Sequence, residues 1–158
     1  MNIVARIFKI ILSFIPAALI AFMIFNFSSQ TSIESSSLSR KVTKGIVMLV
    51  DEITNSDWSE EEIDARVEKY EYYVRKGAHM TEYAILAFSV MLPLRACGLK
   101  GFSLFFMTML ICGGFAATDE YHQMFVSGRA AALKDVFIDC TGACIGCGFS
   151  GLLIWIMR

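Results

Sequence analysis

Ionisable side chains recur at helical spacing in segments that otherwise carry little charge. His79 and Glu82 are three residues apart, and Asp135 and Asp139 are four residues apart, so each pair shares one helix face. Five further polar residues lie close to these pairs in the sequence: Lys76, Asp119, Glu120, Gln123 and Arg129. Histidine and carboxylates are suited to proton transfer, and arginine is suited to bidentate binding of phosphate. These residue types predict a site for acid–base chemistry or for recognition of an anionic group.

The nine residues divide into two groups by the chemistry that each side chain supports. Histidine exchanges protons near neutral pH and a carboxylate can act as the base, so the candidate catalytic residues are His79, Glu82, Asp119 and Glu120. The candidate substrate-binding residues, two of them cations suited to phosphate, are Lys76, Gln123, Arg129, Asp135 and Asp139. No nucleophile elbow, Walker loop or lipid-phosphatase signature accompanies them, so the sequence leaves open whether the protein is an enzyme.

Three other interpretations fit the same residues. Carboxylate–histidine units build metal sites in helical bundles, so a metal site is one interpretation. The spacing here is not a zinc pattern such as H-E-x-x-H, and the sequence therefore identifies neither a metal nor a cofactor. The residues are also suited to binding a lipid headgroup or a partner protein without any reaction. Finally, they would serve as a network of ion pairs that locks the helices of a non-catalytic scaffold or accessory protein.

The composition indicates a small membrane protein. The chain has 158 residues, of which 56% are hydrophobic and only 18% are charged, whereas soluble domains are about 45–50% apolar and about 25% charged. The formal net charge of −1 leaves no basic excess, which argues against a nucleic-acid partner and for the lipid bilayer as the main one. We expect a single membrane domain over residues 1–158.

Four apolar segments predict an all-α bundle of four transmembrane helices. The predicted spans are residues 8–27, 77–94, 101–118 and 138–157, each long enough to cross a hydrocarbon core of about 30 Å. The second span contains His79 and Glu82 near its start, so its first turns should lie at the interface or face the protein interior. Gly142-x-x-x-Gly146 in the last span permits a close approach of helices.

The extramembrane loop, residues 28–76, carries the pattern of two amphipathic helices. Apolar residues recur at helical spacing between positions 38 and 53 and again between 63 and 74. Ser59 and Glu62 form a capping box at the start of the second helix, and residues 55–57 provide the link. This loop could pack on the bundle or the membrane surface, or cover a site.

Antiparallel threading predicts that the polar residues meet at one end of the bundle. The end of the first span, the start of the second, the end of the third and the start of the fourth all lie on the same side of the membrane. Charges at membrane depth cost about 2.5–3.5 kcal/mol each, so they should face inward and pair. Arg6 and Lys9 flank the first span closely, which predicts a multi-pass protein with both termini in the cytoplasm.

Three blocks of the sequence resemble the signature blocks of the VanZ-like family. They are residues 76–83 (KGAHMTEY), 119–129 (DEYHQMFVSGR) and 135–142 (DVFIDCTG), and residues 27–30 also fit the family pattern. The chain departs from the family at Ser127, where proline is common, and at Asp139, where asparagine is common. The resemblance covers roughly residues 7–155. It implies a protein of the bacterial cell membrane that interacts with or modifies a cell-envelope component, such as a lipid-linked cell-wall precursor, with lowered sensitivity to teicoplanin as a consequence.

Overall fold

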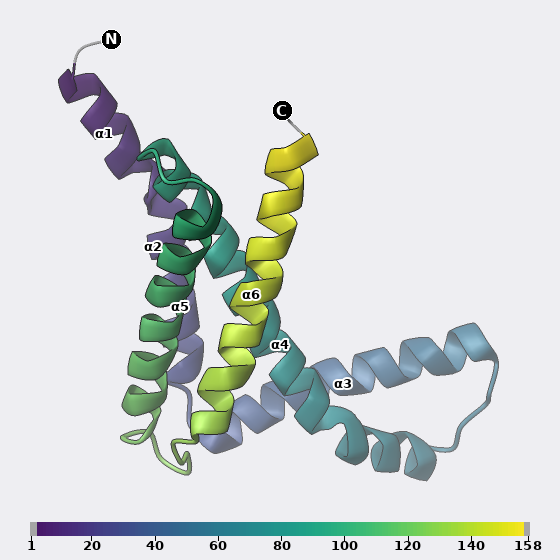
Figure 1. Cartoon of the computed structure of the whole chain (residues 1–158). Helices are drawn as coiled ribbons and strands as arrows, with labels where there is room; N and C mark the ends of the chain where they lie inside the picture. Colours follow the sequence, from purple (N-terminus) through teal and green to yellow (C-terminus); the bar gives the residue numbers. More distant parts are fainter. Residues whose placement is uncertain (1–2, 157–158) are drawn as a thin grey trace.

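The computed structural model describes residues 3–156, apart from the side chain of Arg6, and within this range it contains helices and no strand (Figure 1). The helices are α1 (Ile3–Ser13), α2 (Ile15–Ser28), α3 (Ser32–Thr54), α4 (Glu60–Ala96), α5 (Gly101–Gln123) and α6 (Leu133–Ile156). The predicted all-α class is therefore confirmed. Residues 1–2 and 157–158 of the predicted domain, including the end of the predicted last span, lie outside the described residues.

Three helical segments are long and apolar enough to cross a membrane: α1 with α2 (Ile3–Ser28), α5 and α6. They correspond to three of the four predicted spans. The predicted span 77–94 is the C-terminal half of α4 and is not one of them, so the prediction of four spans is confirmed only in part. The polar side chains of His79 and Glu82 make this half of α4 less apolar than the other three predicted spans.

The second half of α4 is the central helix of the bundle, which consists of α1, α2, residues 77–96 of α4, α5 and α6. It contacts α2, α5 and α6, whereas each apolar helix leaves more of its surface exposed. Its buried residues Tyr83, Leu86, Ala87 and Val90 lie in one core with residues of the three neighbouring helices. A helix enclosed by other helices meets protein rather than lipid, so it does not need a uniformly apolar surface.

Residues 28–76 form two helices, as the apolar periodicity predicts, but the second does not stop at the predicted membrane boundary. It is the first part of α4, which continues without a break from Glu60 to Ala96. Thr31 with Glu34 and Ser59 with Glu62 form complete capping boxes that start α3 and α4, so the predicted Ser59 box is confirmed. The two helices pack side by side and extend sideways from the lower end of the bundle (Figure 1). We call α3 and residues 60–76 the hairpin arm.

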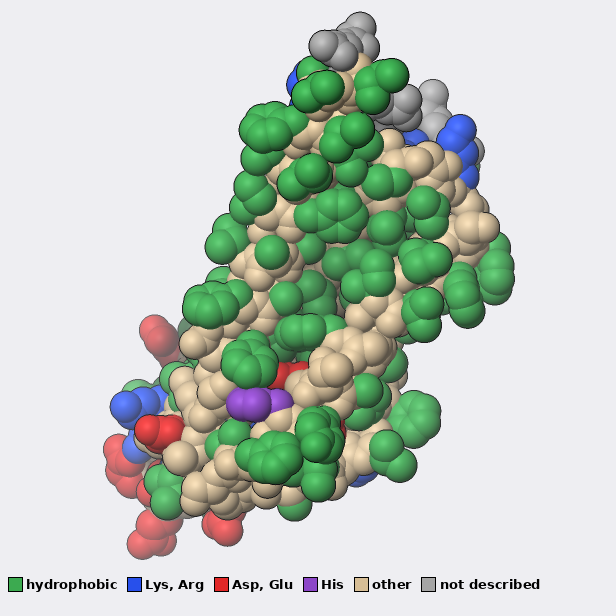
Figure 2. Space-filling model, turned by 90° about the vertical axis from the view of Figure 1, so that its left-hand side faces the viewer, with side chains coloured by type: hydrophobic (Ala, Val, Ile, Leu, Met, Phe, Trp, Pro, Cys, Tyr) green, Lys and Arg blue, Asp and Glu red, His purple; other side chains and the backbone are tan. Residues whose placement is uncertain are grey.

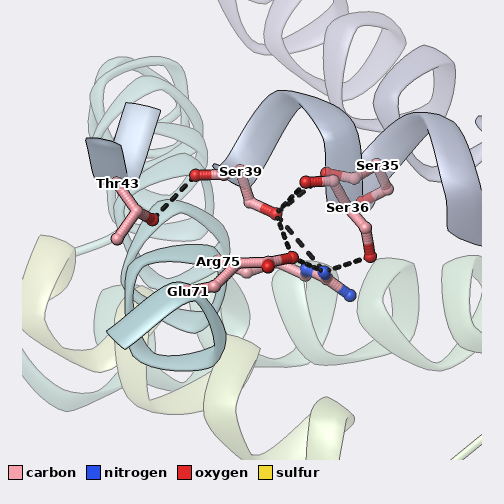
Figure 3. Close-up of polar contacts among 6 residues, drawn as sticks. All are labelled: Ser35, Ser36, Ser39, Thr43, Glu71 and Arg75. Carbon is pink, nitrogen blue, oxygen red and sulfur yellow. Dashed lines mark hydrogen bonds and ion pairs between the residues drawn. The ribbon is translucent and has the colours of Figure 1, made fainter. Parts of the chain in front are cut away.

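Arg75 joins the two helices of the hairpin arm near the bundle. One guanidinium nitrogen, Nη2, donates to Ser36 Oγ at 2.6 Å and to Ser39 Oγ at 3.3 Å on α3, and to Glu71 Oε1 at 2.7 Å on α4 (Figure 3). Further out, Val47 packs with Ile63 and Val67 in a small apolar cluster. The arm is therefore held by a polar contact at its base and by an apolar one further along.

Two glycines bring α6 against α4. A Cβ atom on Gly142 would lie 2.2 Å from the carbonyl oxygen of Met80, and one on Gly146 would lie 2.2 Å from that of Ala84. The two helix backbones are therefore in direct contact, as the spacing of these glycines predicts. Asp139 lies three residues before Gly142 and thus on the same face of α6, which directs it towards α4.

Charged and apolar side chains separate along the molecule. Figure 2 shows hydrophobic side chains over most of one face and acidic side chains gathered at the lower end. The end of α2, residues 76–82 of α4, the end of α5 and the start of α6 all lie at this lower end (Figure 1). The elements that carry the predicted site residues therefore meet there.

Candidate functional site

A polar cavity of about 170 Å³ lies where α4, α5, α6 and the start of α3 meet. Seven of the nine predicted site residues line it: Lys76, His79, Glu120, Gln123, Arg129, Asp135 and Asp139. Two helices extend beyond the predicted spans and thereby carry some of these residues. α5 continues past residue 118 to Gln123, and α6 begins at Leu133 rather than at residue 138. The structure thus collects residues from three separate blocks of the sequence around one space.

Arg129 reaches the cavity from the connecting loop, residues 124–132. Gly128 has a φ of +75°, and the Arg129 amide donates to the Val126 carbonyl at 3.1 Å, which forms a tight turn. The Arg129 guanidinium donates to Gln123 Oε1 at 3.0 Å. Burial, and secondarily the positive charge of Arg75, lower the pKa of Arg129 from its usual value. The turn therefore holds a cation in a position where an anion would stabilise it.

The other two cations of the cavity wall already have carboxylate partners. Lys76 Nζ lies 2.7 Å from Asp135 Oδ2, which joins α4 to α6, and Arg75 is paired with Glu71. Within residues 3–156, Arg129 has no carboxylate within ion-pair distance. Its charge is therefore the one on the wall that is left for a ligand.

Glu120 and Asp139 provide acceptors on the wall. Glu120 Oε1 accepts a hydrogen bond of 2.6 Å from the Ala132 amide, which ties α5 to the connecting loop. Asp139 is only 6% exposed, and its side chain accepts no hydrogen bond from the described residues. Asp139 lines the cavity, so a ligand with hydroxyl or ammonium groups would find an acceptor in its carboxylate.

Two predicted site residues lie outside the cavity lining. Asp119 is 1% exposed and accepts hydrogen bonds from Ser28 Oγ at 2.6 Å and Gln123 Nε2 at 3.2 Å, so it ties α5 to the end of α2. Glu82 faces a second space beside the cavity, and its Oε2 lies 3.5 Å from His79 Nδ1. Both residues thus contact a cavity residue without lining the cavity.

A comparison with family models matches residues 13–156 to the VanZ/LLP1 family, and this range includes all three resemblance blocks. The chain belongs to the VanZ/LLP1 family. No curated protein and no solved structure matches it. The resemblance seen in the sequence is therefore confirmed at the level of the family.

Sequence reasoning missed two polar side chains of the cavity wall in this VanZ/LLP1 protein, those of Ser32 and Arg75. Both belong to residues 28–76, the predicted extramembrane loop, in which the sequence indicated no site residue other than Lys76. The Ser32 amide donates to the Ser127 carbonyl at 3.2 Å, so the hairpin arm and the connecting loop meet at the cavity. Arg75 directly precedes Lys76, the first residue of the first block, and this adjacency was the signal in the sequence that could have identified it as a cavity residue.

The side chains of this VanZ/LLP1 site do not form a metal centre of the usual kind. Among residues 3–156, no group of three or more His, Cys, Asp or Glu side chains is close enough to hold a metal ion. His122, which shares the second block with Asp119, instead packs its ring against Phe25, with 4.3 Å between ring centroids. The cavity is lined by a guanidinium without a carboxylate partner among the described residues, a histidine and several carboxylates.

Proposed function

We propose that the cavity binds the phosphate-containing headgroup of a cell-envelope component at one face of the bacterial membrane. The observation that carries the proposal is Arg129, a half-buried cation on the cavity wall without a carboxylate partner among the described residues. A phosphate would accept two hydrogen bonds from the guanidinium. Asp139 and Glu120 on the same wall would accept hydrogen bonds from hydroxyl or ammonium groups of the same headgroup.

In this proposal the chain crosses the membrane four times, with residues 77–94 of α4 as the enclosed span. Both termini lie in the cytoplasm, and the cavity and the hairpin arm lie at the outer face. The start of α1 and the end of α6 lie at the same end of the molecule, which supports this arrangement (Figure 1). A headgroup held at the outer face would alter access of teicoplanin to its cell-wall target and lower sensitivity to the antibiotic.

The cavity also contains the groups that acid–base chemistry would need. His79 and Glu120 line it, so each could exchange a proton with a bound headgroup. The deciding measurement is whether purified protein consumes a labelled undecaprenyl-linked precursor or only retains it. If the wild-type protein consumes the precursor and Glu120→Gln does not, the protein catalyses a reaction. If the wild-type protein only retains the precursor, its role is binding.

The test of binding is Arg129→Gln, which removes the unpaired charge and keeps a hydrogen-bonding side chain. We expect at least about a tenfold weaker binding of inorganic phosphate by the purified protein, because a charge-assisted bidentate contact contributes about 1.5–3 kcal/mol. We also expect loss of any teicoplanin phenotype at unchanged abundance in the membrane.

Lys41→Gln is the matched control. Lys41 is an exposed cation on α3 at the same end of the molecule but outside the cavity lining. If both variants bind phosphate as tightly as the wild type, the proposal is wrong. If Arg129→Gln instead lowers abundance and Lys41→Gln does not, the polar residues form a structural network, as expected of a scaffold.

A further inference from the structure

An apolar groove of about 150 Å³ lies beside the polar cavity, between the end of α2, α3 and α4. Its apolar walls are Phe27, Leu38, Val42, Val74 and Ala78. Three of these residues, Phe27, Leu38 and Val42, are 39–49% exposed, so the groove is open rather than filled by the protein's own core. The exposed surface of the groove is therefore mainly apolar, in contrast to the cavity, although polar residues such as Gln30, Ser35 and Glu82 also line it.

The groove and the polar cavity share part of their walls. Arg75, His79 and Arg129 line both spaces, so these side chains form the boundary between them. A molecule whose phosphate contacts Arg129 in the cavity would thus have the apolar groove immediately beside its headgroup. The arrangement places an anion site and a hydrocarbon site on two sides of the same guanidinium.

The apolar side of α3 continues the groove away from the cavity. Leu38, Val42, Ile46, Leu49 and Ile53 recur at intervals of three or four residues and are 46–70% exposed. A helix with such a stripe and a charged opposite face is suited to lie in the membrane interface, with its stripe towards the acyl chains. The groove then opens from the bilayer side, where chains are available.

We infer that the ligand is a single amphiphile, with its phosphate headgroup in the polar cavity and the first part of its hydrocarbon chain in the groove. The inference rests on the proposed function for the headgroup. It adds that the ligand enters sideways from the bilayer and that a water-soluble phosphate compound fills only half of the site. Hydrocarbon buried in the groove supplies affinity that the charged cavity alone does not.

The test compares inorganic, ethyl, hexyl and decyl phosphate as ligands of the purified full-length protein in detergent, measured by calorimetric titration. We expect binding to tighten with chain length, with decyl phosphate at least about tenfold tighter than ethyl phosphate, since each buried methylene contributes up to about fourfold. Val42→Trp, which fills the groove from α3, should remove most of this gain and leave inorganic phosphate binding unchanged.

Ile53→Trp is the matched control, since Ile53 belongs to the same stripe of α3, is 70% exposed and does not line the groove. It should keep the full gain with chain length, which corrects for partitioning of the ligands into detergent. Ala78→Trp fills the groove from α4 and provides a second variant if Val42→Trp fails to fold, as judged by circular dichroism.

Two outcomes would overturn the inference, and they differ. If phosphate binds in an Arg129-dependent way but chain length has the same effect in wild type and in the folded groove variants, the groove holds no chain and the proposed function stands. If neither inorganic nor ethyl phosphate binds, the proposed function fails and the inference fails with it.

Discussion

At the scale of single residues, the site depends on how one arginine is held. Arg129 has a carbonyl partner for its amide, an amide partner for its guanidinium and no carboxylate partner among the described residues. Gly128 supplies the left-handed backbone conformation that this turn requires, and a Cβ atom there would lie 3.0 Å from the Cβ of Ser32. The charge is thus positioned by backbone geometry rather than by an opposite charge.

Gly128→Ala should disturb the site although the substitution adds only one methyl group. A side chain at positive φ costs about 1–2 kcal/mol, and the contact with Ser32 forces the hairpin arm or the connecting loop to move. We expect a lower melting temperature in detergent and weaker phosphate binding. Gly114→Ala, in open space on α5, is the control and should change neither quantity. Unaltered phosphate binding in Gly128→Ala would show that the turn does not position Arg129.

At the scale of elements, the contact between α4 and α6 decides how the halves of the site meet. The Lys76–Asp135 ion pair and the position of Asp139 both require that α6 lie directly against α4. Backbone contact at Gly142 and Gly146 makes this possible, because any side chain there would separate the helices. The same packing therefore stabilises the bundle and closes one wall of the cavity.

Gly146→Ala should destabilise the protein, because its Cβ atom would overlap the Ala84 backbone, which cannot rotate away as a side chain can. Overpacking of this kind typically costs about 1–3 kcal/mol. We expect reduced abundance in the membrane and a lower melting temperature. Gly148→Ala, on the same helix with no atom within 4 Å of its Cβ position, is the matched control. Equal stability of the two variants would mean that the helices are further apart than described.

At the scale of the whole molecule, the chain combines an apolar bundle with an amphipathic hairpin arm. The polar cavity lies where the two parts join, and residues of both line it, Arg75 and Ser32 from the arm and Glu120 and Asp139 from the bundle. Because α4 runs through both parts without a break, Lys76 and His79 lie on the same continuous helix as the outer part of the arm. The arm is therefore part of the site rather than a separate loop.

The proposed orientation predicts which parts of the chain an impermeant thiol reagent can reach. Cys97 is exposed and directly follows α4, whose C-terminal end lies away from the hairpin arm (Figure 1), so a membrane-impermeant maleimide should not label it in intact cells. A cysteine introduced as Ser56→Cys at the tip of the arm, in a Cys97→Ser background, should be labelled. Both should react after the cells are permeabilised. Labelling of Cys97 in intact cells, with Ser56→Cys protected, would invert the orientation.

The sequence alone determined the family and most of the helical segments. Hydrophobic length predicted three of the helices that can cross a membrane, capping chemistry predicted the start of α4, and the three blocks indicated the VanZ/LLP1 family. These features are readable because they depend on residues close together in the chain, through helix periodicity and local hydrogen bonds. Helical spacing also grouped His79 with Glu82 and Asp135 with Asp139.

Only the tertiary structure decided which of these faces meet. Helical spacing indicates that His79 and Glu82 share a face. The packing of α3 against α4 places His79 in the walls of both the cavity and the groove, and Glu82 in the wall of the groove alone. In the same way, the structure shows Asp119 as a buried tie to Ser28, and it places Arg75 in the cavity wall from a segment whose position the sequence left open. Contacts between distant segments depend on how whole helix surfaces fit together, which no local pattern specifies.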